Sequence, residues 1–419
     1  QLSRAYEEAG EKRKAADTLE HLAARYPDFE RMDEIKFRLG EHYFSEKKYI
    51  KANKAYEAVL AYGADNKFYE SALKKQGWSY FKQDNYSHAL YYFTTALDHV
   101  IEQGYVPGSK GSRVDNAQTE DIYRAISLSF SYMGGADAIE AYIRNSGNTV
   151  YEQAFYQHLA DYYLSRNRYT DAAKTYQAYI DKYPLSETSA AYSMRIIEVY
   201  QQGGFIDLAT RARKDFSVKF GPQSDYWRQL DPDVQKLTAS LQKSNIRTLT
   251  GFYHARYQKL KEGKARQESY KQAMHWYREY YYLFPLDEHA PQMRKLLAEL
   301  YLENGDYRDA ALEFEYIAKN NPASDMAAES AYAALFAYRE SLKSLPESRR
   351  RSAREHIADK SLKFAENYPH HAETGAVLTA AAYDYLLLKN FSAATTTARQ
   401  VLSVYPQSDP SLLHEARIV

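Results

Sequence analysis

The chain of 419 residues contains no cysteine, and that absence excludes a disulfide framework and any thiolate metal site. It has no excess of charge either, because 55 lysine and arginine residues balance 55 aspartate and glutamate residues. The overall charge therefore gives no reason to expect a nucleic-acid partner. Every run of apolar residues is well short of the ~18 that a transmembrane helix needs, so we expect no transmembrane segment.

Motifs for catalysis or metal binding are missing as well. The sequence has no His-Glu-x-x-His, and its one adjacent pair of histidines, His370–His371, follows Pro369 in a predicted polar turn. The glycine-containing segment Gly104–Ser112 has its lysine in the wrong order for a phosphate loop. We therefore expect no enzyme activity, no cofactor and no metal site. The basic run Ser348–Arg354 has two open interpretations, a solvated start of a helix or a contact with phosphate, lipid or an acidic partner.

Tyrosine, with 42 residues, is the type in excess, and much of it follows an internal repeat. Each of five units has an aromatic anchor, an alanine three residues later, a tyrosine six residues earlier, and a glycine or alanine nine residues earlier. The anchors are Tyr49, Tyr86, Tyr169, Tyr307 and Phe391; the alanines are Ala52, Ala89, Ala172, Ala310 and Ala394; the tyrosines are Tyr43, Tyr80, Tyr163, Tyr301 and Tyr385; and the small residues are Gly40, Gly77, Ala160, Ala298 and Ala382. These small residues and tyrosines are the predicted structural signature of the repeat.

The spacing predicts two short helices in each unit. The small residue and the tyrosine that follows it lie on one face of the first helix, and the alanine after the anchor marks close approach of the second. A proline fifteen residues after the anchor, as at Pro184, Pro322 and Pro406, ends the second helix because it cannot donate the next hydrogen bond. Small residues are thus expected to lie against rings at a fixed interval.

This pattern resembles the tetratricopeptide repeat, a family of helical pairs with a period of about 34 residues. The resemblance implies an all-α fold, a right-handed α-solenoid of about ten helix-turn-helix repeats. We expect about six units in residues 1–222 with a loop insertion near 101–121, a longer or additional helix in 223–262, and about four units in 263–419. We also expect the chain to be a fragment of a longer array.

The resemblance further implies a partner-binding surface, because the first helix of each unit lines the concave side of such arrays and holds a protein or peptide partner. Matching the family's positions to this sequence selects Phe37, Glu41, Phe44, Lys74, Trp78, Phe81, Gln157, Asp161, Lys295, Glu299 and Tyr383. Aromatics flanked by charges suit a protein partner. The alternative for each aromatic is packing between repeats.

Several second helices end in an aromatic residue and proline followed by serine or an acidic residue, as in the segments 182–187 and 404–409. This sequence pattern resembles that of tetratricopeptide-repeat proteins of the bacterial envelope, such as the lipoprotein of the outer-membrane β-barrel assembly machine and the periplasmic Tol–Pal coordinator. It implies a non-catalytic protein–protein interaction scaffold, periplasmic or associated with the outer membrane, within a membrane-bound complex. The alternatives are the superhelical part of a larger envelope enzyme that acts on peptidoglycan or polysaccharide, and a cytoplasmic regulator.

Overall fold

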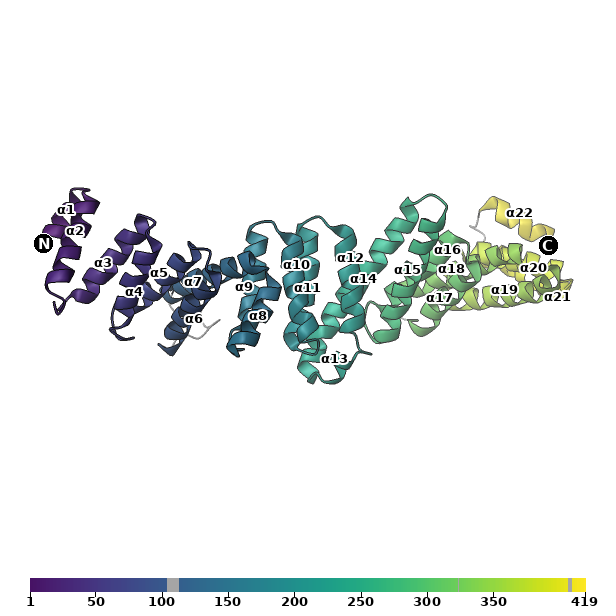
Figure 1. Ribbon diagram of the computed structural model, residues 1–419. Helices are drawn as coiled ribbons and strands as arrows, with labels where there is room; N and C mark the ends of the chain where they lie inside the picture. The colour runs from purple at the N-terminus through teal and green to yellow at the C-terminus, as the bar shows by residue number, and fades with distance from the viewer. Residues whose placement is uncertain (104–112, 323, 406–408) are drawn as a thin grey trace. The chain divides into compact units, whose positions relative to one another are not determined.

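The computed structural model describes residues 1–103, 113–322, 324–405 and 409–419, with the backbone alone for residues 113–118. These residues contain 22 α-helices and one 3-10 helix, and no strand lies among them (Figure 1). The predicted all-α solenoid is confirmed. The chain forms two compact units, Gln1–Ala212 and Arg213–Val419.

In the N-terminal unit each helix from α1 to α11 packs on the next, and α7 also packs on α9. We call the first helix of each pair helix A and the second helix B. The helices are α1 (Leu2–Glu8), α2 (Lys12–Arg25), α3 (Met32–Ser45), α4 (Tyr49–Leu60), α5 (Tyr69–Phe81), α6 (Tyr86–Glu102), α7 (Arg113–Met133), α8 (Ala136–Ser146), α9 (Glu152–Ser165), α10 (Tyr169–Lys182) and α11 (Glu187–Gln202), followed by α12 (Ile206–Lys219), which contains the division between the units.

The C-terminal unit continues the same pairing. In the range 223–262 it contains a short helix and one of 28 residues, capped by the side chain of Asp231 with Pro232 in its first turn. The helices are α13 (Asp225–Arg228), α14 (Pro232–Lys259), α15 (Lys264–Leu283), α16 (Ala290–Asn304), α17 (Tyr307–Asn320), α18 (Met326–Ser341), the 3-10 helix η1 (Leu342–Ser344), α19 (Glu347–Asn367), α20 (Thr374–Leu387), α21 (Phe391–Val404) and α22 (Pro410–Ile418).

The small residues of the repeat lie where the helices approach most closely. Ala52, Ala89 and Ala172 have no exposed surface. A Cβ atom placed on Gly40 would lie 2.5 Å from the ring of Tyr56, and one on Gly77 would lie 2.5 Å from the ring of Phe93. The remaining signature alanines, Ala160, Ala298, Ala310, Ala382 and Ala394, are buried as well. In the two units with a glycine, the ring of helix B therefore occupies the space that a side chain on helix A would need.

The turn from helix A to helix B is the same in five units. The residue two positions before helix B has a positive φ, at Lys47, Asp84, Asn167, Gly305 and Lys389. The N–H of the next residue donates to the carbonyl of the signature tyrosine, from Lys48 to Tyr43, Asn85 to Tyr80, Arg168 to Tyr163, Asp306 to Tyr301 and Asn390 to Tyr385, over 2.8–3.0 Å. This six-to-one bond closes a Schellman motif and gives each pair the same geometry at its turn.

The loop insertion predicted near 101–121 is wrong for residues 113–121, which belong to α7. Residues 104–112 lie outside the described residues. Thr119 and Ile122 are buried, and α7 packs on both α6 and α9. Burial of this helix face outweighs the polar composition that favoured a loop.

Buried tyrosines predict a loss of stability at high pH. Burial raises the pKa of Tyr156 and Tyr176 to about 12, whereas tyrosine in an unfolded chain titrates near ~10. Their contribution to stability is fully present below the unfolded value and is lost as the pH rises toward the folded value, on the order of 2–3 kcal/mol for each group. We expect the helical signal in circular dichroism to fall together with buried phenolate absorbance. Titration of all phenols below that range, with the helical signal intact, would contradict this expectation.

Candidate protein-binding surface

The partner-binding residues predicted from the repeat lie on helix A of their units, in two groups. Eight belong to the N-terminal unit, on α3, α5 and α9, and three to the C-terminal unit, on α16 and α20. Their exposure differs widely: Phe81 is buried, Gln157 and Tyr383 are exposed, and the other eight are half-buried.

The two predicted acidic contacts of the N-terminal unit are already bound within the array. Glu41 accepts a hydrogen bond from Tyr56 at 2.5 Å and another from Lys75 of the next helix A at 2.7 Å. Asp161 likewise accepts from Tyr176 at 3.2 Å and lies 3.9 Å from Arg195. Each carboxylate therefore bridges its own helix B and the next helix A. Burial and the bond to Glu41 both raise the pKa of Tyr56, which keeps its hydroxyl a donor.

Phe37 and Phe44 also take part in packing between helices. The ring of Phe37 stacks on Phe68 with centroids 5.0 Å apart. Phe44 meets the ring of Tyr49 edge-on at 5.5 Å, and the ammonium of Lys75 lies 5.7 Å from the Phe44 ring centroid. Both rings belong to the hydrophobic cluster around Tyr56. They remain half-buried, so part of each ring is open to solvent.

An aromatic cluster lies at the ends of α5 and α7 and includes one exposed ring. It consists of Trp78 and Phe81 from α5, Tyr86 from α6 and Tyr132 from α7, and we call it the α5–α7 aromatic cluster. Phe81 meets Trp78 and Tyr132 edge-on, both at 5.5 Å, and Tyr86 stacks on Tyr132 at 5.3 Å. Although Tyr132 contacts two rings, 62% of its surface is exposed. The four rings are therefore in contact with one another, while most of Tyr132 stays open to solvent.

Sequence reasoning missed Tyr132, because the preceding segment was expected to be a loop and the unit around Gly135 matches the repeat poorly. A signal was present in Phe130, which stands six residues before the start of α8, where the other units have tyrosine. Its carbonyl accepts from the N–H of Gly135 at 2.8 Å, the same turn bond as elsewhere. If the repeat pattern had been aligned on Phe130, it would have placed Tyr132 at the end of a helix A.

The remaining predicted residues do not gather into a comparable cluster. Lys74 pairs with Glu70 of its own helix at 2.7 Å. Lys295 and Glu299 lie 4.0 Å apart on α16, and Tyr383 on α20 is 54% exposed. Whether these side chains contact a partner stays a prediction.

The residues that the structure describes contain no candidate for a metal site or a membrane-spanning helix. Among them no group of three or more histidine, aspartate or glutamate residues is placed to hold a metal ion. Likewise, no helix in the described ranges combines the length and the apolar character needed to cross a bilayer.

Comparison with known proteins identifies tetratricopeptide repeats in two segments of the chain. Residues 132–187 and residues 1–28 match tetratricopeptide-repeat models, and no curated protein matches the sequence. Among solved structures, the C-terminal part of a tetratricopeptide-repeat protein from Cytophaga hutchinsonii is 14% identical over 70% of this chain and 98% of its own, with a TM-score of 0.28. Yeast Tom70 is 9% identical over 100% of this chain and 98% of its own, with a TM-score of 0.26. Scores this low support no functional argument.

The two matched segments and the helical pairs show that the chain contains tetratricopeptide repeats. Arrays of this family are scaffolds for protein–protein interaction, because stacked repeats present an extended surface to a partner.

Proposed function

We propose that this chain is a non-catalytic scaffold of the bacterial cell envelope that binds a protein partner through the α5–α7 aromatic cluster. The exposure of Tyr132 within an ordered set of rings carries the proposal. Binding energy in protein interfaces concentrates in tyrosine, tryptophan and arginine side chains that are already held in place. Trp78 and Tyr132 meet that description, and exposed Lys82, which follows Phe81 in the chain, supplies a charge at the edge of the cluster.

The envelope location rests on the sequence. A chain without cysteine is suited to an oxidising compartment, where stray thiols react. The aromatic-proline helix ends resemble those of envelope members of the family. The location is tested by tagging the full-length protein and fractionating the bacterium that carries its gene. Recovery of the protein in the cytoplasm would favour the alternative function, a cytoplasmic regulator.

Substitution of Tyr132 tests the surface itself. We expect Tyr132→Ala to weaken capture of the partner about tenfold or more, as loss of an interface hot spot of ~2 kcal/mol does. Partners are captured by cross-linking in envelope extract and compared between variants by mass spectrometry.

Tyr91→Ala is the matched control. Tyr91 is 60% exposed and meets Tyr92 edge-on at 5.1 Å, but it lies on α6, a helix B, outside the cluster. A partner retained by Tyr91→Ala and lost with Tyr132→Ala supports the proposal. Partners unaffected by both substitutions, with both variants folded, would exclude this cluster as the binding surface.

A further inference from the structure

A groove in the C-terminal unit lies between α17 and α19, which are both B helices, with α18 between them. Its larger part is a cavity of about 750 Å³ lined by the start of α17, the end of α18 and the first turns of α19. A second cavity of about 290 Å³ lies further along the same three helices. Tyr338 lines both, so the two cavities are adjoining parts of one groove, which we call the α17–α19 groove.

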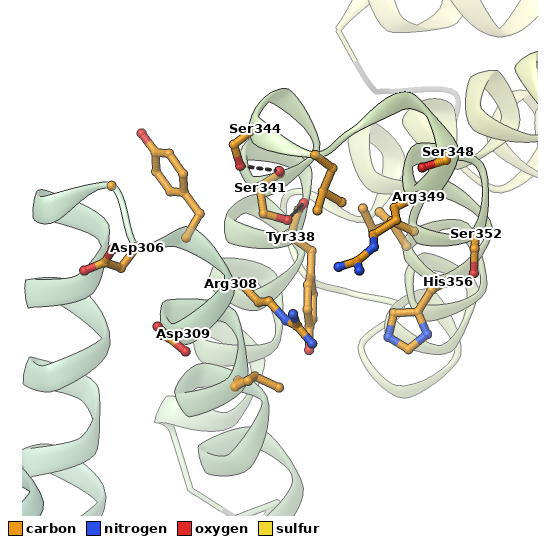
Figure 2. Close-up of a pocket in the computed structure, with 16 residues that line it drawn as sticks. Asp306, Arg308, Asp309, Tyr338, Ser341, Ser344, Ser348, Arg349, Ser352 and His356 are labelled. Carbon is orange, nitrogen blue, oxygen red and sulfur yellow. Dashed lines mark hydrogen bonds between the residues drawn. The ribbon is translucent and has the colours of Figure 1, made fainter.

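The walls of the larger cavity carry polar side chains that face one another. Figure 2 shows Arg308 reaching in from α17, and Arg349 and His356 from α19 on the opposite side, with the ring of Tyr338 between them. Hydroxyl groups from η1, α18 and α19 complete the lining, including those of Ser344 and Ser352.

The groove has an unbalanced positive charge. Among the described residues, Arg308 and Arg349 have no carboxylate within ion-pair distance, and neither do Lys319 and Lys363, which line the smaller cavity. Two neighbouring arginines of the basic run differ in this respect. Arg350 pairs with Glu347 at 3.0 Å, and Arg354 is bound to a buried aspartate of α20.

The acidic groups near the groove are mostly engaged. Glu315 is paired with Lys360 and accepts from the hydroxyl of Tyr338 at 2.7 Å. Asp306 accepts from Tyr270 and from Asn304, and it points away from the cavity. Asp309 is the remaining acidic side chain of the lining, against several cations.

The basic side chains of α19 are spaced along the groove rather than gathered at one point. Arg349, His356 and Lys363 follow one another at intervals of seven residues, which keeps them on one face of the helix. Fourteen residues of α-helix extend about 21 Å, and an extended chain of about six residues covers that distance. A row of separated cations matches several carboxylates along an extended chain better than it matches one phosphate.

We propose that the α17–α19 groove is a second binding site, which takes an extended, acidic segment of a protein partner. Carboxylates of the segment pair with Arg308, Arg349 and Lys363, while Leu312 and Leu345 contact its aliphatic side chains. The site lies on B helices of the C-terminal unit and is independent of the α5–α7 aromatic cluster.

The test uses the whole chain and a fluorescent peptide of glutamate interspersed with leucine. Its binding is measured by fluorescence anisotropy as a function of salt. We expect saturable binding that weakens with salt, and a ten- to hundredfold loss on the double substitution Arg349→Glu and Lys363→Glu. The same peptide with lysine in place of glutamate should not bind.

The control reverses two charges outside the groove, Arg351→Glu and Lys271→Glu. Arg351 is exposed on α19 next to Arg349 but lines neither cavity, and Lys271 is exposed on α15. Retention of peptide binding in this control, with loss in the groove variant, supports the proposal. Equal loss in both variants would mean an effect of net charge and would overturn it.

Other anionic ligands are tested as competitors. Vesicles that contain phosphatidylserine, a single-stranded oligonucleotide and inorganic phosphate are measured on the same two double variants. If any of these binds through Arg349 and Lys363 while the acidic peptide does not, the groove is not a protein-binding site. Circular dichroism of each variant establishes that a loss of binding is not a loss of fold.

Discussion

Asp384→Ala is expected to lower the free energy of unfolding of the C-terminal unit by about 2–4 kcal/mol, the largest effect of any single substitution proposed here. The Asp384 side chain on α20 is 2% exposed. It accepts a hydrogen bond from Arg354 of α19 at 3.0 Å and forms an ion pair with Arg339 of α18 at 2.8 Å. One carboxylate thus ties three consecutive helices together.

The physical reason is the charge that the substitution leaves behind. Removal of one partner from a buried ion pair is more harmful than replacement of the whole pair, because the other charges stay desolvated without compensation. Both arginines are 28% exposed, so solvent moderates the effect and keeps it below the upper end of the range for fully buried pairs. Asp384→Asn, which keeps the volume and one acceptor oxygen, should have a smaller effect.

Urea unfolding followed by circular dichroism measures this difference, and hydrogen exchange of α18–α20 localises it. Asp225→Ala is the control, because Asp225 pairs with Arg228 at 2.9 Å with both side chains more than two-thirds exposed. We expect about 0–1 kcal/mol there. An equally small effect for Asp384→Ala would show that the three-helix ion pair contributes little to stability.

Gly77→Ala is expected to destabilise the α5–α6 pair by about 2–3 kcal/mol, although alanine is the better helix former. The new Cβ would lie 2.5 Å from one ring carbon of Phe93 and 2.7 Å from another. The ring has no exposed surface and cannot move outward without displacing its neighbours. Overpacking therefore outweighs the ~1 kcal/mol that alanine gains over glycine inside a helix.

Gly251→Ala is the control, because at this position the same substitution is expected to stabilise the protein instead of destabilising it. Gly251 lies in the interior of α14 and is exposed, with no atom within 4 Å of the position that a Cβ would take. There we expect a gain of about 0.5–1 kcal/mol from helix propensity alone. Since repeats contact only their neighbours, hydrogen exchange of α5 and α6 is the appropriate readout for Gly77→Ala. Slower exchange in α5 and α6 would contradict the packing argument.

The sequence by itself determined the repeat, because its chemistry is local. A small residue such as Ala89, a tyrosine such as Tyr80 and the turn between them lie within about ten residues, and each meets a steric requirement that recurs in five units. The periodicity therefore predicted the helical pairs and the positions that are buried. The start of α7 was missed because its composition is that of a loop, while the packing that holds it comes from α6 and α9.

Only the tertiary structure decided what the surface residues do. Glu41 and Asp161 were predicted to contact a partner, but in the structure each forms an ion pair with a lysine or arginine side chain of the next repeat. The α5–α7 aromatic cluster and the α17–α19 groove bring together side chains that are tens of residues apart. Which of them meet depends on how one repeat stacks on the next, and that contact has no local signal in the sequence.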